Sequence, residues 1–125
     1  MNWRLYISCF VLLPLFAGAR QESVDAAMLH RAQSALTKVI VHDIFSPPVA
    51  SRIYLDASMA AYEASLPSRR DFHSLAFSIA HFPKVTPPQK GAVIRYDLAE
   101  LYAFMKTAGR LVFSEKMLDD SLQLT

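Results

Sequence analysis

Apolar residues recur at helical spacing in long stretches of the chain, at positions 23–44, 49–64 and 89–112. In each stretch they fall on one side of a helix, and charged or hydroxyl-bearing residues occupy the other side. A helix with such a face is stable only when the face is buried against a partner. The pattern therefore predicts amphipathic helices that pack on one another.

Shorter elements complete the predicted architecture. Asp71 is a suitable cap for a short helix from Phe72 to about His81, and Ser114 with Glu115 is typical of the start of a last helix. The strict alternation that marks half-buried strands does not occur in the sequence. The predicted fold class is therefore all-α, with about four to five amphipathic helices joined by proline-rich corners in an incomplete helical bundle.

The predicted apolar faces differ in the size of their side chains. The first consists of Leu29, Ala32, Leu36, Val39 and Ile40, and the second of Val49, Ile53, Ala57, Ala60, Ala61 and Ala64. The longest helix is expected to bury Ile94, Leu98, Leu101, Tyr102, Met105, Ala108 and Val112, and the short one Leu75, Ile79 and Phe82. Because alanine lets a neighbouring helix come close, the second face is expected to pack near the short end of the usual interaxial range of about 8–10 Å.

A double proline separates the first two long helices. Ser46 precedes Pro47 and Pro48, and its hydroxyl is expected to accept a hydrogen bond from a free N–H group of the helix that follows. Proline suits a first helical position because the N–H that it lacks has no helical partner there. Thr86, which is also followed by a double proline, repeats this start signal.

Residues 1–19 have the organisation of a secretory signal peptide. Arg4 supplies a positive charge, the run from Leu5 to Phe16 is almost wholly apolar, and small residues up to Ala19 form a cleavage pattern. The apolar run is shorter than the roughly 20 residues that a membrane-spanning helix needs. We therefore expect a cleaved signal and no stable membrane anchor after its removal.

Cleavage after Ala19 would leave residues 20–125 as one exported domain, periplasmic or extracellular. Cys9 lies within the signal, so this domain would contain no disulfide. Lys and Arg number 13 against 11 Asp and Glu, a net charge of +2, and these charges are dispersed. Nucleic-acid binding, which needs a basic patch or stripe, is not expected.

The sequence lacks the common motifs of nucleotide-binding and hydrolytic sites. Its glycines are Gly18, Gly91 and Gly109, which cannot form a phosphate-binding loop or a nucleophile elbow. Its histidines are His30, His42, His73 and His81, and no two are spaced i, i+4 as metal ligands on one helix would be. We assign no catalytic, cofactor-binding or metal-binding residue.

His42 and Asp43 form the most suggestive polar pair, because an imidazole beside a carboxylate can act as an acid–base catalyst. The alternative is structural, since a histidine near a helix C-terminus interacts favourably with the free carbonyl groups. Arg52 and Glu63 lie in a segment poor in charge and must be paired if they are buried. Aromatic and methionine side chains are expected in the core or between helices, namely Tyr102, Phe104, Met105, Phe113 and Met117.

The corner from Val41 to Tyr54, with Ala60–Ala64 after it, resembles the N-terminal region of bacterial exported proteins of the vanadium-dependent haloperoxidase and type 2 phosphatidic acid phosphatase (PAP2) superfamily. The resemblance continues at Ser74–Ala76 and at Leu111–Met117. It implies an all-helical fold in which a lysine, two arginines and a helix N-terminus hold phosphate or vanadate. One histidine would be nucleophile or vanadate ligand and another a general acid–base.

The family's catalytic signatures are a lysine with a downstream Arg-Pro, a Pro-Ser-Gly-His, and a Ser-Arg followed at a fixed distance by histidine. None of them occurs in this sequence. The resemblance therefore implies that the catalytic C-terminal part is missing and that residues 20–125 are a truncated N-terminal portion. Vanadate would be a cofactor of a full-length parent and not of this chain.

These observations support two hypotheses about function. In the first, the chain is the helical scaffold of a secreted phosphatase- or haloperoxidase-like protein, silent alone, and its partner is the missing catalytic bundle or a second copy bound through apolar helix faces. The parent reaction would be phosphate-ester hydrolysis or vanadate-dependent halide oxidation. In the second, the chain is a self-standing secreted helical interaction domain without enzymatic activity.

Overall fold

The computed structural model describes residues 24–83, 85–89 and 91–123, and the predicted signal peptide lies outside them. The helices are α2 (Val24–His42), α3 (Pro47–Ser65), α4 (Tyr96–Leu111) and α5 (Glu115–Gln123), with short 3-10 turns η2 (Leu66–Ser68) and η3 (Leu75–Phe77). The described residues contain no strand. The predicted all-α class is confirmed.

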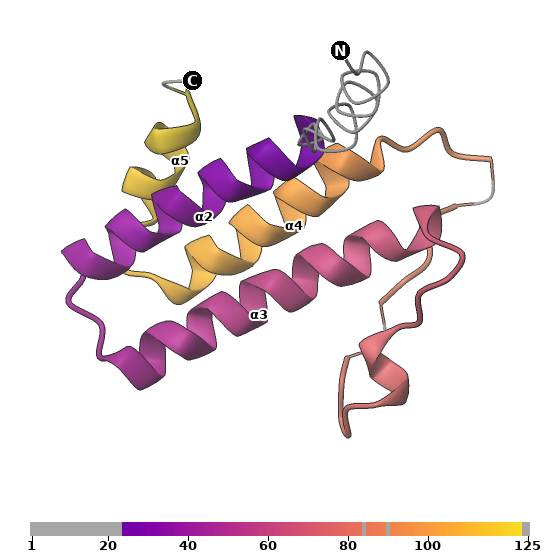
Figure 1. Ribbon diagram of the computed structural model, residues 1–125, viewed down its shortest axis with the longest axis horizontal. Coiled ribbons are helices and arrows are strands. Elements are labelled where there is room, and N and C mark those ends of the chain that lie inside the picture. The colour runs from indigo at the N-terminus through magenta and orange to yellow at the C-terminus, as the bar shows by residue number, and fades with distance from the viewer. Residues whose placement is uncertain (1–23, 84, 90, 124–125) are drawn as a thin grey trace, which may run out of the picture.

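The long helices α2, α3 and α4 lie side by side, with α3 antiparallel to the other two (Figure 1). α4 packs mainly against α3 and also contacts α2, while α5 lies against α2 and α4. The segment between α3 and α4 loops away from one end of this layer. In the described residues, no helix is both long and apolar enough to cross a bilayer.

A single hydrophobic core joins all the α-helices. Its buried side chains are Ala32, Ala35, Leu36, Val39, Ile40, Ile53, Ala57, Ala61, Phe104, Met105, Ala108, Val112 and Leu118. The predicted face of α2 is confirmed at Ala32, Leu36, Val39 and Ile40, which are buried. α3 buries Ile53, Ala57 and Ala61, as the spacing of its alanines predicts. Val49, at the start of α3, is 45% exposed and lies outside the core.

The buried face of α4 agrees with the predicted one at Met105, Ala108 and Val112, and the expected place of Phe104 in the core is also confirmed. The predicted burial of Leu98 and Tyr102 is wrong, since they are 45% and 65% exposed. α4 contacts helices on several sides, so its apolar sector is broad.

The predicted helix from Phe72 to His81 is wrong. Only η3 forms there, and its cap is Ser74, whose hydroxyl accepts a hydrogen bond from the Ala76 amide at 3.1 Å. α3 holds the segment in an irregular path because the Tyr62 hydroxyl donates to the His73 carbonyl at 2.8 Å. This hydrogen bond fixes the His73 backbone against α3. The start signal at Thr86 is also wrong, since α4 begins only at Tyr96.

The backbone of the double-proline corner has the predicted form, with α3 beginning at Pro47. Ser46 is the N-cap residue of α3 with an extended conformation, and Pro47 occupies the first helical turn. The Ser46 hydroxyl makes no capping hydrogen bond, which differs from the prediction. Across the corner, the Tyr54 hydroxyl donates to Oγ1 of Thr37 at 2.7 Å and ties α3 to α2.

The C-terminus of α2 ends in a Schellman motif with isoleucine at the position that usually holds glycine. The Phe45 amide donates to the Ile40 carbonyl at 3.2 Å, and the Ile44 amide donates to the Val41 carbonyl at 3.3 Å. Ile44 has a φ of 57°, in the left-handed region that a β-branched residue rarely adopts. Its side chain is 88% exposed, so packing within the described part of the chain does not offset this strain.

Replacing Ile44 with glycine is therefore expected to raise the free energy of unfolding by about 0.5–1 kcal/mol, because glycine removes a left-handed penalty of about 1–2 kcal/mol and gives back part of it as unfolded-state entropy. Urea denaturation would measure the change. Val41→Gly is the matched control, since Val41 is exposed but lies inside α2. It should lower stability, and a loss of stability in both variants would contradict the strain at Ile44.

Candidate functional site

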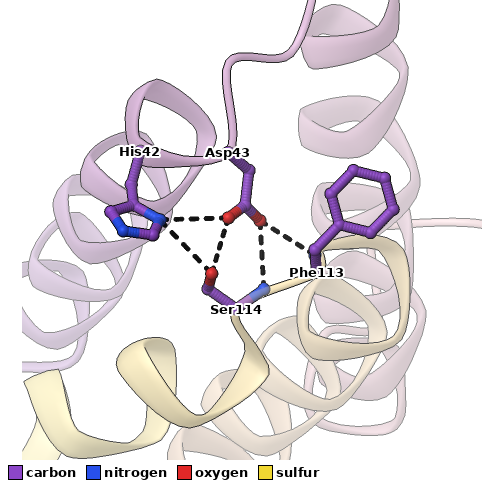
Figure 2. A network of polar contacts seen from close by, with 4 residues as sticks. All are labelled: His42, Asp43, Phe113 and Ser114. Carbon is purple, nitrogen blue, oxygen red and sulfur yellow. Dashed lines mark hydrogen bonds and ion pairs between the residues drawn. The ribbon is translucent and has the colours of Figure 1, made fainter.

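A polar network joins the C-terminus of α2 to the corner between α4 and α5 (Figure 2). Oδ2 of Asp43 accepts hydrogen bonds from the amides of Phe113, at 2.8 Å, and Ser114, at 3.1 Å. Oδ1 accepts the Ser114 hydroxyl at 2.6 Å. The Asp43 side chain is 3% exposed, whereas that of the neighbouring His42 is 61% exposed.

These hydrogen bonds stabilise the ionised form of the Asp43 carboxyl group. The Ser114 hydroxyl has the largest effect in lowering the pKa of Asp43, from 3.8 to about 2, with smaller contributions from His42 and the two amides. Desolvation acts in the opposite direction and is outweighed. Asp43 is therefore a carboxylate at neutral pH and accepts hydrogen bonds only.

The network contains the residue types of a Ser-His-Asp triad but not its geometry. Nδ1 of His42 lies 3.1 Å from Oδ1 of Asp43 and 3.3 Å from Oγ of Ser114, so the same nitrogen faces both partners. A triad needs the carboxylate on one ring nitrogen and the serine on the other. Here the Ser114 proton points to Asp43. The arrangement supports the structural interpretation of His42 and Asp43.

The partners of Asp43 lie 70 and 71 positions along the chain, and no local pattern marks them. Ser114 is predicted as a helix cap, and its carbonyl does accept the Met117 and Leu118 amides at the start of α5. Its hydroxyl donates to Asp43. The ring of Phe113 stacks on Phe45 with centroids 5.0 Å apart, so the aromatic pair covers the same junction.

The described residues around His42 do not fit a vanadate or phosphate site. Such an anion needs converging cations, and the nearest ionised group to His42 is the Asp43 carboxylate, which repels an anion. Several arginines pair with acids elsewhere in the described chain, namely Arg52 with Asp56, Arg69 with Glu100, and Arg95 with Asp97. In the same part of the chain, no group of three or more His, Cys, Asp or Glu side chains could hold a metal ion.

Glu63 and Arg52, singled out by their charge, have different environments. Glu63 is 6% exposed, and its Oε1 accepts the Leu75 amide at 2.6 Å. The Ser74 hydroxyl lies 2.9 Å from Oε2 and 3.1 Å from Oε1. Arg52 is exposed and pairs with Asp56 one turn along α3, with Nε 3.3 Å from Oδ2. Glu63 thus anchors the segment after η2 to α3, while the Arg52 pair stays at the surface.

A hollow of about 620 Å³ opens between α3, α4, residues 79–83 and Val85. Most of its walls are apolar, and Glu63 contributes to one of them. Of the four histidines, His81 lines the hollow, and His30, His42 and His73 do not. The hollow extends along α3 from Arg52 to Ala64 and includes no residue of the Asp43 network.

Comparison with known proteins gives a similarity to a solved structure. No protein-family model matches the chain, and no curated protein matches it. Among solved structures, a bacterial vanadium-dependent iodoperoxidase is 34% identical over 78% of this chain, with a TM-score of 0.73. The match covers 24% of the iodoperoxidase, so this chain spans about a quarter of the length of that protein.

The similarity combines sequence identity with the path of the backbone, and both extend over most of the chain. It agrees with the all-helical architecture and with the family that the double-proline corner indicates. The chain therefore has a vanadium haloperoxidase-like, all-α fold.

Proposed function

We propose that this chain is the N-terminal helical scaffold of an exported protein of the haloperoxidase and PAP2 superfamily, and that it is catalytically silent alone. The observation that carries the proposal is the unequal coverage of the match, 78% of this chain against 24% of the iodoperoxidase. A parent protein would hydrolyse phosphate esters or oxidise halides with vanadate. The catalytic groups for either reaction would come from outside this chain.

The chemistry of the described residues agrees with a scaffold role. The Asp43 carboxylate is committed to amide and hydroxyl donors that join α2 to the corner before α5. His42 uses the nitrogen that faces this cluster and makes no contact typical of a general base. The most suggestive polar group in the sequence thus stabilises the junction between helices.

The surface also supports a packing function. Large apolar side chains are exposed along the described chain, among them Val41, Ile44, Phe77, Val93, Tyr102 and Phe113. Scattered exposed apolar residues are ordinary, but extended apolar surface usually marks an interaction site. In the proposed scaffold these positions contact the catalytic bundle of the parent.

The proposal predicts that the purified chain shows no turnover of p-nitrophenyl phosphate and no vanadate-dependent oxidation of iodide by hydrogen peroxide. A vanadium-51 NMR titration should likewise show only free vanadate, because Arg52, Arg69 and Arg95 are each paired with an acidic side chain. His42→Ala is the diagnostic variant. Turnover that persists through purification and disappears in His42→Ala would overturn the scaffold proposal.

The second candidate function is a self-standing secreted interaction domain. It is favoured by the complete pairing of buried polar groups: in the described residues, no buried side-chain nitrogen or oxygen lacks a hydrogen-bond partner. A monomer in sedimentation that unfolds cooperatively and binds little of a hydrophobic dye would support this candidate. Dye binding together with self-association would support the scaffold.

A further inference from the structure

We propose that the hollow between α3, α4, residues 79–83 and Val85 is the docking site of an amphipathic helix that presents a lysine or arginine to Glu63. The inference rests on the proposed function in one respect: it takes the helix to belong to the catalytic part of the parent protein. The argument for the site itself comes from the walls of the hollow and from the charge of Glu63.

The walls of the hollow are shaped for another helix. Its lining from α3 and α4 includes Ala60, Ala64 and Ala103, whose small side chains let a backbone approach closely. The larger apolar side chains at its margin are Met59, Ile79, Phe82 and Val85. Ile79 and Val85 are 42% and 54% exposed, so much of their apolar surface has no partner in the described chain. An apolar helix face would cover it.

Glu63 supplies the polar recognition element. Its carboxylate is 6% exposed and lines the hollow, and its hydrogen bonds come from a neutral amide and a neutral hydroxyl. Within residues 24–83, 85–89 and 91–123, no basic side chain forms an ion pair with it. A carboxylate oxygen can accept more than one hydrogen bond, and Oε2 receives only that of Ser74. A cationic donor therefore complements this wall.

Among the described residues that line the hollow, no other charged group forms an ion pair with Glu63. Arg52 and Asp56 line the same hollow and pair with each other, Nε to Oδ2 at 3.3 Å. His81 also contributes to the lining. The Arg52–Asp56 pair has no net charge, so Glu63 gives its side of the mostly apolar hollow a negative charge. Electrostatic complementarity of this kind selects the partner and fixes its register.

Synthetic amphipathic helices can test the proposal on the full chain. The probe is a peptide of about 14 residues, four helical turns, with a leucine stripe and one central lysine at the edge of the stripe. Two further peptides replace this lysine with norleucine or glutamate. Isothermal titration should give a dissociation constant about tenfold lower for the lysine peptide than for the norleucine peptide, as a charge-assisted hydrogen bond predicts. The glutamate peptide should bind most weakly.

Glu63→Gln should reduce the preference for lysine over norleucine to near unity, because glutamine keeps an oxygen for the Leu75 amide but has no charge. Glu115→Gln is the matched control, since Glu115 is an exposed acid on α5 that does not line the hollow. It should leave the preference unchanged. Circular dichroism would establish that both variants are folded.

Ala103→Leu provides a test that leaves Glu63 intact. The larger side chain fills part of the hollow, so binding of both the lysine and the norleucine peptides should fall about tenfold or more. Equal binding of these two peptides to the wild-type chain, or unchanged binding to Ala103→Leu, would overturn the docking site. Neither result involves turnover of phosphate esters or iodide, so failure here is distinguishable from failure of the scaffold proposal.

Discussion

Replacing Phe104 with alanine is expected to lower the free energy of unfolding by about 3–5 kcal/mol, the largest effect of any single truncation that we predict for this chain. Phe104 lies on α4, is 2% exposed, and belongs to the core that joins all the α-helices. Removing its ring loses the burial energy and leaves a cavity that the surrounding helices can only partly fill. Because single domains are stable by about 5–15 kcal/mol, this loss is a large fraction of the total, and the urea and thermal midpoints of unfolding should fall clearly.

Phe113→Ala is the matched control for this prediction. Phe113 is also an aromatic residue near the end of α4, but it is 82% exposed and its only aromatic contact is with Phe45 among the described residues. Its truncation should cost about 1 kcal/mol or less, in the range of a single aromatic pair. Thermal and urea unfolding would compare the variants. Similar losses at both positions would contradict the assignment of Phe104 to the core.

Substituting Asp43 with asparagine is expected to destabilise the chain at neutral pH and to remove part of its sensitivity to acid. The wild-type carboxylate has its pKa lowered from 3.8 to about 2, mainly by the Ser114 hydroxyl. A lowered pKa means that the unfolded chain binds the proton more tightly than the folded chain does. The stabilisation from Asp43 is therefore complete above about pH 4 and is lost as the pH falls from 3.8 towards 2.

Urea denaturation between pH 6 and pH 2 would measure this effect. In the wild type, unfolding in the acidic part of the range should take up about one more proton than in Asp43→Asn, and the stability difference between the two should shrink as the pH falls. Asp120→Asn is a suitable control because Asp120 is an exposed acid on α5. A stability difference between the wild type and Asp43→Asn that is constant over the whole pH range would contradict a stabilising role for the ionised Asp43 carboxylate.

Most of the helical architecture could be predicted because it depends on local periodicity. The stripe on α2 from Ala32 to Ile40 has the spacing of one helix face, and it is buried in the structure. The corner at Ser46 and Pro47 could be predicted from the conformational limits of proline. These features need only the chain's own backbone and side-chain geometry.

The segment from Phe72 to His81 could not be predicted in the same way. Its apolar spacing is compatible with a short helix, but short helices are marginal without tertiary support. In the structure, Tyr62 and Glu63 take up the carbonyl of His73 and the amide of Leu75. These hydrogen bonds cross from α3 and have no counterpart in the local pattern.

Only the local part of the candidate site, the pairing of His42 with Asp43, could be predicted from the sequence. His42 and Asp43 adjoin each other in the sequence, so their pairing and their place at a helix end follow from local structure. The donors that engage the carboxylate belong to Phe113 and Ser114 across the bundle. Without them, a catalytic pair and a structural clamp have the same sequence pattern.

The sequence by itself indicated that this protein is helical, where its first two described helices meet, and that it resembles the haloperoxidase and PAP2 superfamily. Those properties depend on residue spacing, on proline geometry and on residue identity along the chain. Only the tertiary structure decided that Asp43 joins α2 to the corner before α5, that Tyr102 stays exposed and that Glu63 borders a hollow. The physical reason is that burial and hydrogen bonding depend on which groups from distant segments are brought together, and helix packing makes that choice.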